Sequence, residues 1–411
     1  MKMTDKKLKK QAFTFLLLMG IVSLLADMTY ESARSLIGPY LLFLGASASA
    51  VGFVSGLGEF IGYAVRLVFG FVVDKTKKYW LFTILGYSIN LIAIPLLAVV
   101  PPNGWIWAAI LIVCERLGKA VRAPAKTTLV SFAAKRVGTG KGFGFVEVLD
   151  QIGAMLGPLL LFFIMQWKES AGTYAQYQWA FASLAIPALL TLIVLAISKA
   201  IFPKAEEFEL TDSNVDTPKQ KLEFKKIKPI LLYIIAIGLL AVGMADFPLM
   251  AFHIETNKVI DIKYITLLYM MVMGVDGLAA FIFGNLYDKK GAMTLWIAAI
   301  IGLSFAPLVF LTTNITSIVI GLILWGILLG AMESIALAYI ADNVEVNYRG
   351  RILGIYYTFY GITWFIGSWV MGILYNINPK YVAIFSVIIL LSAIIVLWRQ
   401  IKIRKNNENI L

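Results

Sequence analysis

Twelve long apolar segments dominate the sequence and constrain the fold more than any other feature. Each is about 20 residues or longer, enough for an α-helix to cross a ~30 Å hydrocarbon layer. They lie at residues 12–44, 48–73, 79–100, 104–132, 141–166, 174–201, 228–254, 262–287, 293–312, 316–343, 349–376 and 379–401. The alternating segments of about ten residues that build a transmembrane β-barrel are absent from the sequence. The sequence therefore predicts an all-α integral membrane protein with twelve transmembrane helices.

The composition fits a chain that lies mostly in lipid. Hydrophobic residues make up 60% of the 411 and charged residues 15%, with a mean hydropathy of +0.83. A water-soluble domain of this composition could not cover its own surface with polar groups. The single cysteine, Cys114, excludes a disulfide framework and a Cys-based metal cluster. Because no Gly-x4-Gly-Lys-Ser/Thr pattern and no nucleophile–base set is recognisable, we expect no enzyme and no cofactor or metal.

Lysine and arginine gather on one side of the predicted membrane. Twelve alternating segments place both termini on the same side, which carries 26 basic residues against four on the other. Basic loops tend to stay in the cytoplasm, so we expect a multi-pass protein of the cell membrane with both termini cytoplasmic. These loops account for the net charge of +12. The expected acidic partners are membrane lipids rather than nucleic acid.

The longest charge-dense stretch, residues 202–228, separates six segments from six. It predicts a cytoplasmic linker between an N-terminal six-helix bundle at 1–201 and a C-terminal six-helix bundle at 229–411. The halves repeat one another, because "GFVVDKTKK" follows the second segment of the first half and "GNLYDKKGA" the second segment of the second. Pseudo-symmetric halves of this kind are used by transporters to place a site near mid-membrane.

These repeated loops carry a family resemblance. A six-plus-six layout with Gly-x-x-x-Asp-basic loops resembles the major facilitator superfamily over essentially the whole chain. The resemblance implies a secondary active transporter whose bundles rock around a central cavity, with a cytoplasmic latch in which the loop aspartates meet basic groups across the halves. The latch residues would be Gly70, Asp74, Lys75, Gly284, Asp288, Lys289 and Arg349. In the alternative interpretation, the lysines only anchor the loops at the membrane surface.

The segment 141–166 carries a second resemblance. Gly144, Gly153, Gly157 and Pro158 match the spacing found in proton-coupled drug antiporters of this superfamily. The sequence departs where that motif continues to Gly-Gly, since Leu161 and Phe162 stand there. Small residues also let membrane helices pack closely in any bundle, so both an antiporter motif and simple packing remain open.

Charged residues lie inside the predicted membrane segments of the first half. Asp27, Glu31 and Arg34 follow at i, i+4 and i+7, so they share one helix face within about 60°. Each charge costs ~2.5–3.5 kcal/mol at a helix centre facing lipid, so all of them must face one another or a hydrated cavity. They form either structural ion pairs or a proton-coupling network. The residues of this network are Asp27, Glu31, Arg34, Glu59, Arg66, Glu115, Lys119, Arg122, Lys126, Glu147 and Asp150.

In segment 104–132, the bases of the network lie in one stripe. Glu115, Lys119, Arg122 and Lys126 share a helix face, whereas Arg116 lies off it. The bases of this stripe would bind the carboxylate or phosphate of an anionic substrate.

The second half holds acids without bases. Asp246, Asp276 and Glu333 lie in its membrane segments, which carry no Lys or Arg near their centres. An unpaired carboxyl group in a low-dielectric interior can bind and release a proton near neutral pH, and it also suits a cationic ligand. For Asp246 the alternative is a capped kink, because Pro248 follows two residues later.

Aromatic residues predict a cavity wall for a flat or amphipathic ligand. Tyr357, Tyr360 and Trp364 share one face of segment 349–376, and Tyr63 lies between Glu59 and Arg66. Aromatic stripes also serve packing and interface belts. The only histidine, His253, is expected at the surface and not at a metal.

The leading hypothesis is proton-coupled efflux of a small amphipathic or cationic compound by alternating access. A first alternative is proton-coupled uptake of an anionic or zwitterionic metabolite, and a second is a non-transporting membrane sensor on the same scaffold. The expected partners are a small-molecule solute, protons as the coupling ion and membrane lipids, and the protein is expected to be monomeric.

Overall fold

The computed structural model describes residues 5–208, 224–344 and 346–408, and for residues 5, 224–229, 341, 346–351 and 404–408 it describes the backbone alone. All regular elements in these ranges are helices. The first half contains α1 (Asp5–Phe43), α2 (Ala48–Thr76), α3 (Tyr79–Ala93), η1 (Pro95–Val99), α4 (Trp105–Val137), α5 (Thr139–Trp167), η2 (Glu169–Ala171), α6 (Thr173–Ser183), α7 (Ala185–Ile201) and η3 (Ala205–Phe208). The second contains α8 (Phe224–Gly243), α9 (Phe247–Thr256), α10 (Ile262–Lys290), α11 (Met293–Gly302), α12 (Phe305–Phe310), α13 (Ile315–Asn343), α14 (Val346–Ile377) and α15 (Pro379–Glu408).

These elements make twelve crossings, which confirms the predicted fold class. Four crossings consist of two pieces each, namely α3–η1, α6–α7, α8–α9 and α11–α12. In the described part of the chain, ten crossings are long and apolar enough to span a membrane. The other two are α4, with charged residues along its middle, and α14, which is rich in tyrosine, tryptophan and glycine. The chain is a multi-pass membrane protein.

The break between α8 and α9 has a clear local cause. Pro248 stands at the start of α9, where its missing N–H costs no helical hydrogen bond. The side chain of Asp246 caps this helix by accepting a hydrogen bond of 2.9 Å from the backbone N–H of Phe247. The capped-kink interpretation of Asp246 is therefore correct.

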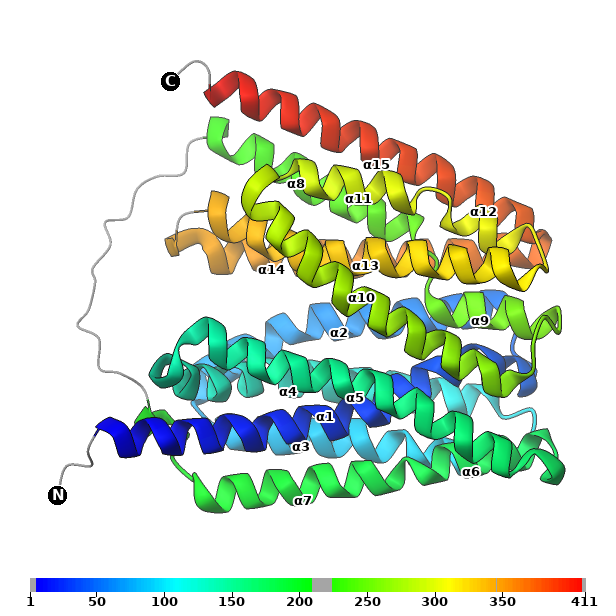
Figure 1. The fold of residues 1–411 in the computed structure, drawn as a ribbon, viewed down its shortest axis with the longest axis horizontal. Coiled ribbons are helices and arrows are strands. Elements are labelled where there is room, and N and C mark those ends of the chain that lie inside the picture. Colours follow the sequence, from blue (N-terminus) through cyan, green and yellow to red (C-terminus); the bar gives the residue numbers. More distant parts are fainter. Residues whose placement is uncertain (1–4, 209–223, 345, 409–411) are drawn as a thin grey trace.

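The helices form two six-helix bundles (Figure 1). In Figure 1, α1–α7 run from blue to green and α8–α15 from green to red, and both termini lie at the same end of the molecule, here called the terminus end. The bundles meet where α2 contacts α14, α5 contacts α10 and α1 contacts α9. The cytoplasmic placement of the terminus end stays a prediction, as do the boundaries at 201 and 229. Residues 209–223 of the predicted linker lie outside the described residues, and α8 begins at Phe224.

Candidate functional site

A cavity of about 160 Å³ lies between the two bundles. Helices of both contribute to it: α1, α2, α4 and α5 from the first half and α10, α13 and α14 from the second. In the described chain its wall carries seven acidic side chains and two basic ones. The acids are Asp27, Glu31, Glu59, Glu147, Asp150, Asp276 and Glu333, and the bases are Arg34 and Lys119.

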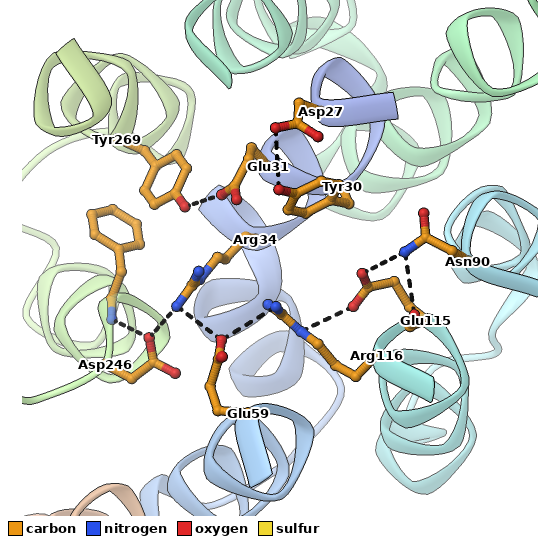
Figure 2. A network of polar contacts seen from close by, with 11 residues as sticks. Asp27, Tyr30, Glu31, Arg34, Glu59, Asn90, Glu115, Arg116, Asp246 and Tyr269 are labelled. Atoms are coloured by element: carbon orange, nitrogen blue, oxygen red, sulfur yellow. Dashed lines mark hydrogen bonds and ion pairs between the residues drawn. The ribbon is translucent and has the colours of Figure 1, made fainter. Parts of the chain in front are cut away.

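A chain of charges includes two residues of the cavity wall, Arg34 and Glu59, and extends beyond that wall (Figure 2). The Nη2 atom of Arg34 lies 3.0 Å from Asp246 Oδ1 and 3.2 Å from Glu59 Oε1. Arg116 extends the chain, with Nη1 at 3.2 Å from Glu59 and Nε at 3.0 Å from Glu115. Because Arg34 belongs to α1 and Asp246 precedes α9, this chain joins the two bundles.

The structure corrects two expectations about this chain. Asp246 is not an unpaired acid, because the Arg34 guanidinium reaches it from the other half. Arg116 was set aside as lying off the α4 stripe, yet it is 6% exposed and bridges two carboxylates. It points away from that stripe toward α2, where Glu59 needs a second partner. Sequence spacing on one helix could not reveal this, because the partner comes from another helix.

Two further carboxyl groups that line the cavity are those of Asp27 and Asp150. Tyr30 donates a hydrogen bond of 3.2 Å to Asp27 Oδ2, and Lys126 Nζ lies 3.7 Å from Asp150 Oδ1. Asp27 is therefore hydrogen-bonded to a tyrosine, whereas Asp150 lies near a lysine.

Five of the seven cavity acids make no ion pair in the described part of the chain, and three of these five, Asp276, Glu333 and Glu147, also lack the tyrosine donor that Asp27 and Glu31 have. Asp276 is 4% exposed, and its Oδ1 atom has no hydrogen-bond partner there. The side chains of Glu333 and Glu147 are exposed and line the cavity. Asp276 and Glu333 thus lie where the prediction placed unpaired acids. Glu31 differs, because Tyr269 of the other bundle donates a hydrogen bond to it.

The bases of α4 do not converge on one surface. Lys119 lines the cavity with its Nζ atom 4.1 Å from the ring centroid of Tyr30. The Arg122 guanidinium lies 4.1 Å from the ring centroid of Tyr87, outside the residues that line the cavity. Lys126 pairs with Asp150. The expected anion-binding stripe therefore contributes one side chain, Lys119, to the cavity wall.

Three of the four predicted aromatic residues, Tyr63, Tyr360 and Trp364, line the cavity. Tyr357 does not, and its ring stacks on Tyr63 at 5.8 Å between centroids. The guanidinium of Arg66 lies over both tyrosine rings, at 5.3 Å from Tyr63 and 5.7 Å from Tyr357. Arg66 therefore belongs to this aromatic cluster and makes no ion pair in the described part of the chain.

The predicted latch is not formed by the side chains that the structure describes. Asp74 and Asp288 are exposed at the ends of α2 and α10, as are Lys75 and Lys289, and no ion pair of these four is seen among the described residues. The side chain of Arg349 lies outside the described residues. Gly70 and Gly284 have open space where a Cβ would stand. The latch stays a prediction for another arrangement of the halves.

The glycines of α5 differ in their surroundings. A Cβ on Gly153 would lie 2.8 Å from the carbonyl carbon of Leu24, and one on Gly157 would lie 2.8 Å from Met28 Cα. These two glycines therefore let α5 approach the backbone of α1. Gly144 has no atom within 4 Å of such a Cβ, and Pro158 is buried within α5. Helix packing explains Gly153 and Gly157, while the antiporter interpretation stays a prediction.

Several site residues escaped the sequence reasoning. Tyr30 and Gln151 line the cavity, and Asn90 donates a hydrogen bond of 2.7 Å to Glu115. Tyrosine and amide residues in apolar segments are too common to single these out. His253 was expected at the surface, but it is 3% exposed and its Nδ1 atom lies 2.9 Å from the hydroxyl of Tyr375. This hydroxyl comes from α14, so its position was hidden from the sequence.

Known proteins share the sequence pattern and the fold. A family model described as Major Facilitator Superfamily matches residues 11–316 and 247–409. An uncharacterized protein of Mycobacterium tuberculosis is 33% identical over 388 residues, covering 94% of this chain and 93% of its own. An uncharacterized MFS-type transporter of Methanocaldococcus jannaschii is 26% identical, covering 96% of each chain.

Solved structures agree in fold at low identity. A nucleoside transporter matches with a TM-score of 0.72 and 12% identity, over 95% of this chain and 99% of the other. A D-xylose–proton symporter matches with a TM-score of 0.65 and 15% identity, over 94% and 96%. Both are transporters that differ in the solute they carry, so the likeness fixes the fold and leaves the solute open.

Proposed function

This chain belongs to the Major Facilitator Superfamily and is a membrane transporter, and from this premise we propose that it exports a small organic cation in exchange for protons. The observation that carries the proposal is the excess of acids in the central cavity, seven against two bases. Three of those acids, Glu147, Asp276 and Glu333, have no basic partner among the described residues. A cationic ligand would supply the missing positive charge.

The size of the cavity limits the part of the ligand that it holds. Its volume of about 160 Å³ is close to that of the engineered cavity of about 150 Å³ that binds benzene. The aromatic rings of Tyr63, Tyr360 and Trp364 line it beside the acids. Aromatic faces attract cations, so an ammonium group next to a small apolar body suits both parts of the wall.

Competition for the carboxyl groups couples the cation to protons. A protonated carboxyl group loses the charge that holds the cation, so each ligand weakens the binding of the other. Three acids of the cavity wall, Asp27, Asp150 and Glu333, are the groups that we assign to this exchange. With a proton gradient directed into the cell, protonation from outside releases the cation there, and proton loss inside lets the next cation bind. This is why we propose export as the direction.

Alternating access requires contacts that can open. Polar contacts between the bundles support this: Lys263 Nζ lies 2.6 Å from Glu169 Oε2, and Asn376 donates a hydrogen bond of 2.9 Å to Ser49. Both lie at the end opposite the termini, which we call the far end. If the termini are cytoplasmic as we propose, the far end is the outer gate, and rocking of the bundles breaks these contacts.

Uptake of an anionic or zwitterionic solute is the second candidate. It is favoured by Lys119, whose ammonium lines the cavity with Arg34 and makes no ion pair in the described chain. The two candidates differ in the charge of the ligand. They therefore predict opposite results for size-matched probes.

The experiment uses benzyltrimethylammonium and benzoate as probes of opposite charge. We expect benzyltrimethylammonium to raise the melting temperature of the purified protein, more at roughly pH 8 than at roughly pH 6, because protons compete with it. In proteoliposomes, a pH gradient should drive its movement. If benzoate raises the melting temperature, benzyltrimethylammonium does not, and the effect of benzoate is lost in Lys119→Gln, then the substrate is an anion and the cation proposal is wrong.

A further inference from the structure

An apolar groove lies between α2 and α14 on the terminus side of the cavity. Its volume is about 1060 Å³, several times that of the central cavity. Most of its wall is hydrophobic, and parts of that wall are open to the lipid-facing surface: Phe71 is 71% exposed, Ile355 47% and Ile362 38%. A largely apolar hollow of this size favours an apolar occupant, because empty space forfeits dispersion contacts.

One side chain belongs to both the groove and the cavity. Tyr63 lines each of them, and its ring stacks on Tyr357 at 5.8 Å and meets Tyr360 edge-on at 5.1 Å. Tyr357 lines the groove and Tyr360 lines the cavity. The partition between the two spaces is therefore made of tyrosine rings, and passage from one space to the other requires Tyr63 to take a different side-chain rotamer.

The balance of charge differs on the two sides of this partition. In the described chain the cavity wall carries seven acids and two bases, whereas the groove carries one acid, Asp74, and one base, Arg66, whose guanidinium lies against Tyr63 and Tyr357. A cationic group is attracted by the excess of acids in the cavity, while an alkyl chain prefers the apolar part of the groove wall. An amphipathic cation is thus oriented with its head in the cavity and its tail in the groove.

We propose that the α2–α14 groove is the tail-binding part of the substrate site, and that the transported compound is a single-tailed cationic amphipath. It reaches the site sideways from the membrane, with its head passing Tyr63 into the cavity. This inference rests on the proposed function for the charge of the head, and it adds the tail and the route. The occupant that competes with it is a bilayer lipid whose acyl chain fills the groove in every state.

The test is a series of alkyltrimethylammonium ions with tails of about two to about twelve carbons. Binding to the full-length protein in lipid nanodiscs is measured as a dissociation constant from the free concentration, so that partition into lipid is subtracted. We expect binding to tighten by up to about fourfold for each added methylene until the groove is filled, and then to level off. Tetramethylammonium reports on the head site alone.

Two isoleucines of α14 offer matched variants. Ile362 lines the groove and is 38% exposed, whereas Ile366, one turn further on, is 45% exposed and does not line the groove. Ile362→Trp narrows the groove, so we expect it to weaken binding of the longest tail by about tenfold while tetramethylammonium changes by less than about twofold. Ile366→Trp should match the unmodified protein. Ile355→Trp is the second groove variant if Ile362→Trp unfolds.

The outcomes separate the two proposals. If the dissociation constant depends on tail length in the same way in the groove variants and in Ile366→Trp, the groove inference is wrong and the groove is assigned to lipid. Binding of tetramethylammonium in that case would still support the proposed function. If folded protein binds none of these ions at either pH, both proposals fail.

Discussion

At the scale of single residues, Asp246 combines two tasks that a substitution can separate. Its carboxylate caps α9 through the Phe247 N–H and pairs with Arg34 of the other bundle. Asparagine keeps an oxygen for the cap and removes the charge, whereas alanine removes both. We expect Asp246→Asn to destabilise the protein and Asp246→Ala to destabilise it by about 1 kcal/mol more. Thermal unfolding in detergent checks this order, and equal melting temperatures would mean that the cap contributes nothing.

Substitution of Glu333 is the most direct test of the proton-coupling proposal. Its side chain lines the cavity and has no basic partner in the described chain, so Glu333→Gln should leave the fold intact. We expect this variant to lose pH-driven cation flux in proteoliposomes by at least about tenfold, because glutamine cannot exchange a proton. Glu206→Gln, at an exposed position of η3, is the matched control. Unchanged flux in Glu333→Gln would remove Glu333 from the coupling site.

At the scale of helices, substitutions of the glycines of α5 distinguish a role in helix packing from a role in an antiporter motif. Gly157 lies against the backbone of α1, and backbone atoms cannot move aside as the end of a flexible side chain can. Gly157→Ala is therefore expected to cost about 1–3 kcal/mol through overpacking. Gly144→Ala meets open space and should be neutral or stabilising by up to about 1 kcal/mol, because alanine favours helix. Melting temperatures measure both, and loss of transport in a stable Gly144→Ala would indicate a role beyond packing.

Helix prediction succeeded where the cause is local and failed where it is tertiary. The long apolar runs gave all twelve crossings, and Pro248 with Asp246 indicated the break between α8 and α9. The break at Leu184 was not predicted, although Pro187 follows it closely. The contacts of Arg34 with Asp246, of Glu31 with Tyr269 and of Arg116 with Glu59 were beyond prediction, since each joins two different elements and the first two join the two halves. Helical periodicity in the sequence predicts which face of a helix a charged residue occupies, but it does not predict which residue of another helix lies opposite that face.

At the scale of the whole molecule, an ion pair joins the two bundles at the far end. Lys263 at the start of α10 pairs with Glu169 between α5 and α6. We expect Lys263→Glu to separate the far ends by charge repulsion. Adding Glu169→Lys reverses both charges and should restore contact.

The measurement is the distance between spin labels on cysteines in loops at the far end, in a Cys114→Ala background. The single variant should shift the distribution to longer distances and the double variant should return it. The shift should shrink at high salt, because Glu169 is half exposed and screening acts on it. A distribution that is the same in all three proteins would show that this pair does not hold the far end closed.

The Asp246 carboxylate has two partners, the Phe247 N–H and Arg34, and this bears on how the two bundles can separate. When the bundles separate there, the Asp246 carboxylate keeps its hydrogen bond from the Phe247 N–H and the Arg34 guanidinium keeps its ion pair with Glu59. Neither charged group is then left without a partner in a low-dielectric interior. Each loses one neighbour out of two. We therefore expect separation of this pair to cost less free energy than separation of a buried ion pair whose members have no other partner.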